Sequence, residues 1–474
     1  MESYKGRFTV SDFSRPLSGI LEITPSGSTL FLIDESSYFS QTPSGSVWIY
    51  GELDNGQHVT LPAAYCVRKA YGHTANGVST LTYSCSQVLI GNVSYSGAPI
   101  AFDAVHLETN LLGKWLGRPT VESEPLEEEL RFTIRNSEPE AFSVALPDGE
   151  KLELVLLQQG WASNEVAGIR LYQITTLVLV PEQRRELQWF LEQERQLWLL
   201  ISLITGLEPE GMRFRGFCLR SDVEMSSARK QGMTPESLMG AYEVQGHFAR
   251  NSFVPDEEKV SQQSLLTVAS NSPAFPSVVG TWYACPAGLH QVVGLLVAAT
   301  RSDDYYLESR LVNLAQALEA THRIMYPEET SMMPKTEFKA FRQKFSQWVH
   351  EEVGELYAEE LIGRIGNLNS VSFQTRLEHL LTPLWDSFLC EHCDDDDLKT
   401  LVKRIAKNRN DISHGNPAGS VSEQIQLVDV MAQSLRIILL HHLGWEMQQA
   451  VSAVSSHEWS RRLRTTVEAE VGSP

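Results

Sequence analysis

Arg409 and His414 are the two side chains of this sequence best suited, by type and spacing, to acid–base chemistry. They belong to the segment Arg-Asn-Asp-Ile-Ser-His-Gly at 409–415. An imidazole can accept or donate a proton near neutral pH, and a guanidinium keeps its positive charge. Asn410 adds a neutral hydrogen-bond donor beside the arginine. The segment therefore indicates a general acid or base next to a fixed cation.

The spacing of arginine, four residues and histidine occurs twice more, so the context has to select the functional pair. Arg68 and His73 lie in a region of strands and turns, where no rigid scaffold would hold them together. Arg436 and His441 bracket the apolar run Ile-Ile-Leu-Leu. Five residues on a regular helix are about 140° apart, which favours the two ends of a core stripe.

A helix from about residue 394 to residue 414 is expected to position the 409–414 pair. Its apolar residues recur at helical spacing, at Leu398, Leu401, Val402, Ile405 and Ile412. Four aspartates at 394–397 suit the positive end of a helix, and Gly415 followed by Asn416-Pro417 ends it. This break would let the Arg409 and His414 side chains converge, and the negative helix end favours a protonated imidazole.

A purely structural interpretation of this helix is also available. Complementarity to the helix dipole alone would place aspartates first and basic residues last, and Arg409 could simply hold a carbonyl. A functional interpretation is favoured by Lys399, Lys403 and Lys407, because residues four apart share one helix face. Such a basic ridge is a local track for phosphates on a chain whose formal net charge is −20, since the charge elsewhere repels polyanions.

Residues 1–180 predict an antiparallel β-rich domain. Apolar and polar residues alternate, and turns such as Asp54-Asn-Gly56 and Pro147-Asp-Gly149 join neighbouring strands. The strand-like segments are Ser18–Thr24, Thr29–Ile33, Val47–Glu52, His58–Leu61, Thr80–Tyr83, Gln87–Ile90, Leu130–Ile134, Lys151–Leu157 and Thr176–Val180. The pattern is typical of a β-sandwich or an open barrel.

The hydrophobic period changes at Pro181. Residues 181–300 are expected to form an amphipathic helix at Gln183–Thr205 and short strands at Met212–Leu219 and Gln291–Ala298, packed on the N-terminal domain. The fold of residues 221–263 is not predicted. Residues 301–474 predict an up-and-down helical bundle with a C-terminal tail, and the fold class is α+β and multidomain. The bundle helices are Tyr305–Met325, Lys335–Leu361 with a break at Gly354, Phe373–Leu389 bent at Pro383, the helix ending at His414, and Ser422–Leu443.

Composition places the chain among soluble globular proteins of two to four domains, with 474 residues, of which 42% are hydrophobic and 21% charged. Neither an N-terminal signal nor an apolar stretch of about 20 residues is visible, so a cytoplasmic protein without a membrane segment is expected. Six dispersed cysteines form no disulfide framework. Cys390 and Cys393 have the spacing of half a zinc site, but no second pair of ligands follows, and two reduced thiols are the simpler interpretation. No cofactor is predicted.

The sequence resembles a known family at both ends. Arg409-Asn410-x-x-x-His414-Gly415, at the end of a helix in a C-terminal bundle, is similar to the motif of HEPN-domain ribonucleases. Further segments resemble the ApeA-like family of bacterial anti-phage proteins, namely Tyr4–Phe8, Leu17–Leu21, Trp48–Gly51, Asn55-Gly56, Val59–Leu61, Ala317–His322 and Ser372–Leu377. Together these segments extend over most of the chain.

The resemblance implies a metal-independent endoribonuclease of abortive infection that cleaves RNA, with tRNA as the expected substrate. It also implies a homodimer through the helical bundle, in which two motifs meet at one cleft, and a β-rich half that responds to a phage-derived trigger. By transfer, His414 would act on the ribose 2′-hydroxyl and the leaving oxygen to give a 2′,3′-cyclic phosphate. Arg409 would stabilise the scissile phosphate, Asn410 would orient one of these groups, and Glu319 is a candidate assisting acid.

Two other functions compete with this one. The protein could be a non-catalytic sensor of a ligand or phage signal, whose bundle only dimerises and whose Arg409 and His414 merely cap a helix. It could also be a zinc-stabilised nucleic-acid adaptor that uses Cys390 and Cys393.

Overall fold

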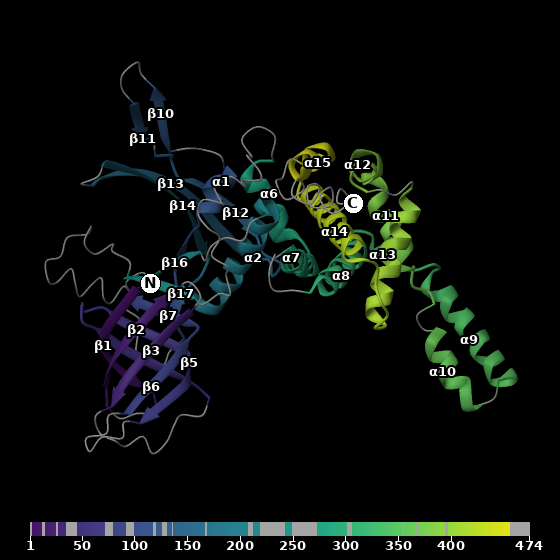
Figure 1. The fold of residues 1–474 in the computed structure, drawn as a ribbon, viewed down its shortest axis with the longest axis horizontal. Coiled ribbons are helices and arrows are strands. Elements are labelled where there is room, and N and C mark those ends of the chain that lie inside the picture. Colours follow the sequence, from purple (N-terminus) through teal and green to yellow (C-terminus); the bar gives the residue numbers. More distant parts are fainter. Residues whose placement is uncertain are drawn as a thin grey trace, which may run out of the picture. The chain divides into compact units, whose positions relative to one another are not determined.

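The computed structural model describes residues 2–11, 15–24, 27–34, 45–71, 79–91, 99–116, 120–125, 130–134, 136–165, 168–206, 212–218, 242–248, 273–300, 306–353, 355–365, 368–393 and 397–455. The chain divides into two compact units (Figure 1). One contains residues 1–270 and 274–284, and the other contains residues 271–273 and 285–474. The first unit is built on strands and the second on helices, as the alternating and helical periods of the sequence predict.

Six strands of the first unit close into a barrel. They pair in the order β5-β4-β1-β2-β3-β6, and β6 pairs with β5 again. Alternate residues point into the barrel and form its core, for example Phe8, Leu21 and Leu30. The strands are β1 Glu2–Val10, β2 Leu17–Thr24, β3 Gly27–Asp34, β4 Ser46–Leu53, β5 His58–Tyr71 and β6 Ser79–Cys85. The barrel is therefore closed, where the sequence pattern left a sandwich and an open barrel as alternatives.

A second set of antiparallel strands continues the sheet from β5 through the β5–β7 pairing. Its order is β7-β17-β16-β9-β14-β13-β12. The strands are β7 Gln87–Gly91, β17 Tyr242–Phe248, β16 Arg213–Cys218, β9 Ala104–Glu108, β14 Gly168–Pro181, β13 Lys151–Glu165 and β12 Glu140–Ala145. Two short pairs stand apart, β10 Val121–Pro125 with β11 Leu130–Ile134, and β8 Ala101–Phe102 with β15 Arg185–Glu186. The predicted strand at Met212–Leu219 is confirmed as β16.

Among the described residues of this unit, three segments are helical, α1 Asn110–Leu116, α2 Leu187–Thr205 and α6 Phe275–Ala284. The helix α2 buries an apolar stripe and ends at Gly206, which has a left-handed conformation. Helices α1 and α6 meet through Trp115 and Phe275, whose ring centroids are 4.8 Å apart. Among the described helices, none is by itself long and apolar enough to cross a membrane, and only α6 and α7 taken together reach that threshold.

The second unit is a helical bundle around α8, which packs against α7, α11, α13 and α14. Its helices are α7 Ala287–Thr300, α8 Leu307–Met325, α9 Lys335–Glu352, α10 Glu355–Ile365, α11 Phe373–Leu381, α12 Cys390–His392, α13 Leu398–Ser413, α14 Val421–His442 and α15 Met447–Ser455. A 3-10 turn at Thr382–Leu384 and a π turn at Trp385–Leu389 follow α11, as the bend predicted at Pro383 requires. The tail at 456–474 lies outside the described residues.

The prediction of a strand at Gln291–Ala298 is wrong, because this segment is the middle of helix α7. A continuous apolar run fits a buried strand and a buried helix equally well. Helix α7 belongs to the helical unit, and the sheet extends beyond residue 180, so the units divide near residue 284 instead of at 180 and 300.

Gly51 on β4 provides a test of the barrel. It lies opposite Phe8, and a Cβ at this position would be 2.6 Å from Cδ1 of Phe8 and 2.9 Å from Cγ1 of Val59. We expect Gly51→Ala to lower the free energy of unfolding by about 1–3 kcal/mol, because an extra methyl overpacks a filled core. Urea denaturation followed by circular dichroism measures the change.

Gly280 on α6 is the matched control, since no atom lies within 4 Å of its added Cβ. Gly280→Ala should leave stability unchanged or raise it by up to about 1 kcal/mol through helix propensity. Equal destabilisation by both variants would contradict the assigned packing.

Candidate active site

Helix α13 begins at an aspartate that caps it. The Asp397 carboxylate accepts a hydrogen bond from the Thr400 backbone N–H at 2.7 Å, which satisfies one of the free donors of the first turn. This bond lowers the pKa of Asp397. The aspartate run thus begins the helix as predicted, although 394–396 lie outside the described residues.

The other end of α13 is capped by His414, which directly follows the last helical residue, Ser413. The His414 backbone N–H donates to the carbonyl of Asn410 at 3.0 Å, and Gly415 follows with φ +71°. The Gly415 N–H donates to the Ile412 carbonyl at 3.1 Å, and the Asn416 N–H donates to the Asp411 carbonyl at 2.8 Å. These two bonds and the left-handed glycine form a Schellman motif. The helix end inferred from Gly415-Asn416-Pro417 is confirmed.

The Arg409 side chain lies in the last turn of α13 and is half-buried. Its Nη1 donates to Oδ1 of Asn410 at 3.0 Å, and the guanidinium is 5.5 Å from the ring centroid of Phe373, the first residue of α11. A cation over an aromatic face is attracted by the ring quadrupole. Arg409 and Asn410 are therefore brought together, and the arginine is oriented from a second helix.

The His414 side chain is exposed. Within the described part of the chain, it makes no hydrogen bond or ion pair, either with Arg409 or with another residue. The Ser413 hydroxyl donates to the Arg409 carbonyl at 2.8 Å, so it serves the helix backbone. His414 is thus accessible to a substrate, and its predicted role and that of Arg409 stay predictions.

The predicted basic ridge lies on the exposed side of α13. Lys399, Lys403 and Lys407 are all exposed, and Lys407 Nζ lies 3.6 Å from Oδ2 of Asp411. A surface ion pair of this kind contributes little stability. Lys407 is therefore partly neutralised by Asp411, while the proposed contact of the ridge with RNA stays a prediction.

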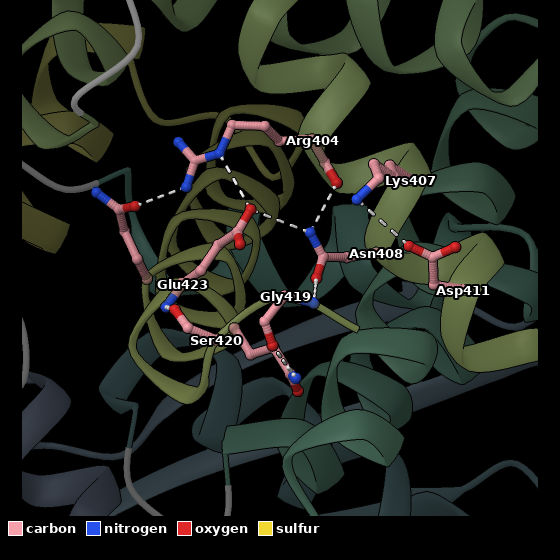
Figure 2. A network of polar contacts seen from close by, with 9 residues as sticks. Arg404, Lys407, Asn408, Asp411, Gly419, Ser420 and Glu423 are labelled. Carbon is pink, nitrogen blue, oxygen red and sulfur yellow. Dashed lines mark hydrogen bonds and ion pairs between the residues drawn. The ribbon is translucent and has the colours of Figure 1, made fainter. Parts of the chain in front are cut away.

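Asn408 is the residue that organises the surroundings of the motif. Its side chain is 2% exposed, and Figure 2 shows its carboxamide between two segments of the chain. The Oδ1 atom accepts from the Gly419 N–H at 3.0 Å, and Nδ2 donates to the Arg404 carbonyl at 3.1 Å and to Oε1 of Glu423 at 3.2 Å. These partners leave one orientation of the amide, and they tie the end of α13 to the start of α14.

The same network holds the first turn of α14. Glu423 accepts from Nε of Arg404 at 3.4 Å, and its backbone N–H donates to the capping Ser420 hydroxyl at 3.2 Å. Gly419 lies directly against the Glu423 side chain, since a Cβ added at Gly419 would collide with the Glu423 carboxylate. The connection 414–420 is therefore held at both ends, at the Schellman motif and at Gly419, whose bond to Asn408 is drawn in Figure 2.

Sequence inspection missed Asn408, although a signal was present. Leu401, Ile405 and Ile412 form an apolar stripe, and position 408 falls within it. An amide at a core position of such a stripe is unusual unless a buried partner satisfies it.

Glu319 on α8 is the partner of a buried arginine on α11. Its Oε1 lies 3.1 Å from Nη1 of Arg376, whose side chain is 1% exposed, and 2.8 Å from Nη2 of Arg323. Nη2 of Arg376 also donates to the Ser370 hydroxyl at 2.8 Å. Arg376 is one turn beyond Phe373, so α11 carries both the residue that contacts Arg409 and the one that binds Glu319. The role of Glu319 as an assisting acid stays a prediction.

Two histidines face each other beside this ion pair. Nε2 of the buried His322 lies 3.2 Å from Nδ1 of His379, and the same Nδ1 lies 3.1 Å from Oε2 of Glu329. Burial lowers the pKa of His322, and the nearby His379 and Arg376 lower it further, while Glu329 raises it. A neutral imidazole at position 322 is therefore favoured in the folded protein.

The two other arginine–histidine pairs do not form comparable sites. Arg436 lies on α14, and burial lowers its pKa to about 10. His441 is exposed, and its Nδ1 bonds to the Trp445 carbonyl at 2.9 Å. Arg68 is exposed on β5, and His73 lies outside the described residues.

The two candidate zinc ligands, Cys390 and Cys393, lie in different environments. The exposed Cys390 thiol donates to the Asp386 carbonyl, and the buried Cys393 thiol donates to the Leu389 carbonyl at 2.9 Å. Neither of these two cysteines forms a disulfide. Within the described ranges, no group of three or more histidine, cysteine, aspartate or glutamate side chains could hold a metal ion.

Comparison with known protein families gives two matches. Residues 3–208 match the family described as ApeA N-terminal domain 1. Residues 312–449 match the family described as Apea-like HEPN, and this range contains α11, α13, α14 and the 409–415 motif. No curated protein and no solved structure matches the chain.

Asn408→Leu tests the network at the motif. We expect the free energy of unfolding to fall by about 1–3 kcal/mol, because the Gly419 N–H and the Glu423 carboxylate lose a buried partner. Amide hydrogen exchange at Gly419 should also become faster. Asn416→Ala, at an exposed position that uses only its backbone in the cap, should change neither quantity. An unchanged exchange rate in Asn408→Leu would contradict the network.

The His322 environment predicts a pH dependence of stability. The unfolded imidazole has a pKa near 6.5, and the folded pKa is lower, so the unfolded state binds more protons as the pH falls below about 6.5. Stability should therefore decrease from pH 7 to pH 5, and His322→Gln should reduce that decrease in urea denaturation. His350→Gln, at an exposed position on α9, is the control. Identical pH slopes in wild type and His322→Gln would refute the assignment.

Proposed function

The chain is an ApeA-like protein with a C-terminal HEPN domain, and on this premise we propose that it is a metal-independent endoribonuclease acting in the cytoplasm. It is an anti-phage defence HEPN protein, and the proposed active groups are Arg409, Asn410 and His414. The single observation that carries the proposal is the geometry of the α13 end. There, a Schellman motif presents an exposed imidazole one turn beyond a guanidinium already oriented by Phe373 and Asn410.

The proposed reaction is transfer of the phosphate to the neighbouring ribose hydroxyl. A neutral His414 takes the proton of the 2′-hydroxyl, and the 2′-oxygen forms a bond to phosphorus. The bond from phosphorus to the 5′-oxygen breaks, and that oxygen receives a proton from a protonated imidazole. The products are a 2′,3′-cyclic phosphate and a 5′-hydroxyl. Arg409 stabilises the negative charge that develops on the phosphate oxygens, and Asn410 holds the guanidinium in place.

A homodimer completes this mechanism. One subunit supplies one exposed imidazole at the motif, whereas in-line attack benefits from a base on one side and an acid on the other. A two-fold axis beside the end of α13 would bring a second His414 without any further sequence. The proposed dimer forms through the helical bundle and binds RNA, with tRNA as the expected substrate and the Lys399, Lys403 and Lys407 ridge as a phosphate contact.

We assign the control of this activity to the β-rich unit. A closed barrel with an attached sheet has no catalytic cluster among its described residues, which suits a role in sensing a phage-derived trigger. The alternative is a sensor whose bundle only dimerises. Glu319 would then be what its contacts suggest, the counter-charge of buried Arg376.

His414→Ala is the decisive variant. We expect cleavage of RNA to fall by about 10²–10⁴-fold, which is the usual contribution of a general acid or base, with the melting temperature unchanged because the side chain is exposed. Arg409→Lys should also lose activity, since lysine cannot reproduce the bidentate guanidinium. Sequencing of RNA ends after induction in cells, and cleavage assays in EDTA, measure the effects.

His441→Ala is the matched control, because it removes an exposed histidine with the same spacing from an arginine. It should cleave RNA at the wild-type rate. Residual cleavage by His414→Ala at that rate, or a requirement for a divalent ion, would overturn the proposed mechanism. Harmless overexpression of wild type, with no new RNA ends, would favour the sensor.

A further inference from the structure

Helix α9 carries a ladder of four aromatic side chains. Phe338, Phe341, Phe345 and Trp348 are spaced by three, four and three residues, so they fall within an arc of about 80° on the helix. Successive ring centroids are 6.2, 6.3 and 5.6 Å apart. Phe341 is 45% exposed and Trp348 is 52% exposed. Large aromatic side chains exposed in a row indicate a binding surface.

The hairpin of α9 and α10 leaves this ladder accessible. Helix α9 packs on α10, and Val349 is its only fully buried residue. In Figure 1 the hairpin extends away from the other helices of the same unit. The ladder therefore belongs to a surface of the helical unit and not to its core.

The charges beside the ladder are positive. From Lys335 to Lys344 the helix has four basic side chains and one acidic one, Glu337, a net charge of +3 on a chain whose net charge is −20. Lys339, Arg342 and Lys344 are exposed, and within the described residues none of them forms an ion pair. No carboxylate occurs between Phe338 and His350.

These charges decide which partner fits. In a two-fold contact between α9 and a second copy of α9, Arg342 and Lys344 of both copies would crowd around the same apolar rings, and like charges would oppose the contact. A polyanion with flat apolar groups meets both features at once. Single-stranded nucleic acids bind proteins by this combination, with bases stacked on aromatic rings and phosphates near cations.

The base of the hairpin is fixed next to the candidate active site. Asn369 accepts from the Met333 N–H at 2.9 Å through Oδ1 and donates to the Met333 carbonyl at 2.9 Å through Nδ2. Its own carbonyl accepts from the Met332 N–H at 2.8 Å. Four residues after Asn369, Phe373 begins α11 and contacts Arg409. A strand lying along α9 would therefore lead toward the start of α11.

We propose that the aromatic and basic face of α9, formed by Phe341, Trp348, Arg342 and Lys344, binds single-stranded RNA and guides it to Arg409 and His414. This inference rests on the proposed ribonuclease function, for which it names the substrate-binding surface. Bases stack on Phe341 and Trp348, and the phosphates between them lie near Arg342 and Lys344.

The test measures binding separately from cleavage. Full-length protein with His414→Ala is titrated into a fluorescently labelled, unpaired 12-nucleotide RNA, and anisotropy gives the affinity. Phe341→Ala and Trp348→Ala should each weaken binding by about tenfold or more, since base stacking is lost. Arg342→Gln and Lys344→Gln should each reduce the slope of log K against log salt by about 0.7, the loss of one phosphate contact.

Helix α10 supplies matched controls. Tyr357 is 57% exposed and Leu361 is 37% exposed, but their helix carries Glu355, Glu359 and Glu360 against Arg364. Tyr357→Ala, Leu361→Ala and Arg364→Gln should bind the RNA as tightly as the parent protein. The charge variants on α9 leave the aromatic packing intact, so they test the surface even if an alanine variant unfolds the hairpin.

Each outcome decides one of the two proposals. Wild-type affinity in all α9 variants overturns the RNA surface, and RNA cleavage by the wild type would then leave the ribonuclease standing. Loss of RNA binding in the α9 variants supports the surface, even if the wild type cleaves nothing and the ribonuclease fails. A change of molar mass in light scattering without a change of RNA affinity would assign this face to a protein contact and overturn the inference.

Discussion

One buried carboxamide sets the geometry around the motif. The Asn408 carboxamide bonds three groups at once, a carbonyl of its own helix, the N–H of Gly419 and the carboxylate of Glu423. All three bonds are needed, because a buried polar group without partners costs about 1–3 kcal/mol. The chain must therefore leave α13, reverse and reach Gly419 within a few residues. The left-handed Gly415 makes that reversal possible. His414 is consequently exposed to solvent while its backbone is held on both sides.

Helix α11 connects the motif to the centre of the bundle. It presents Phe373 to Arg409 at its start, Arg376 to Glu319 one turn later, and His379 to His322 near its end. A buried guanidinium without its carboxylate is strongly destabilising, so the Glu319–Arg376 pair specifies how α8 and α11 align. The position of the Arg409 guanidinium thus depends on the ion pair that buried Arg376 forms with the half-buried Glu319 in another part of the bundle.

What the sequence could predict depended on whether the signal was local. The end of α13 followed from Gly415-Asn416-Pro417, and the break between α9 and α10 followed from Gly354. The closed barrel did not follow, because alternation is the same in a sandwich and a barrel, and closure rests on β5 pairing with both β4 and β6. Asn408 was marked by an amide within the apolar stripe of α13, but its bonds did not follow from the sequence, because Gly419 and Glu423 lie in the next turn and helix. Contacts between distant segments, such as Arg376 with Glu319, left no trace in periodicity.

Asn369 clamps the base of the α9–α10 hairpin through its hydrogen bonds with Met332 and Met333. Because this clamp lies at one end of the hairpin, a small tilt there would be amplified at the other end. Helix α9 has 18 residues and is about 27 Å long at 1.5 Å per residue, so a tilt of about 10° at its base would move its far end by about 5 Å over that length. The Phe338 end, next to the clamp, would hardly move. Any ligand on this helix would therefore be positioned tightly near the clamp and loosely near Trp348. If the ligand is the proposed single-stranded RNA, tolerance for different RNA conformations would increase with distance from Arg409.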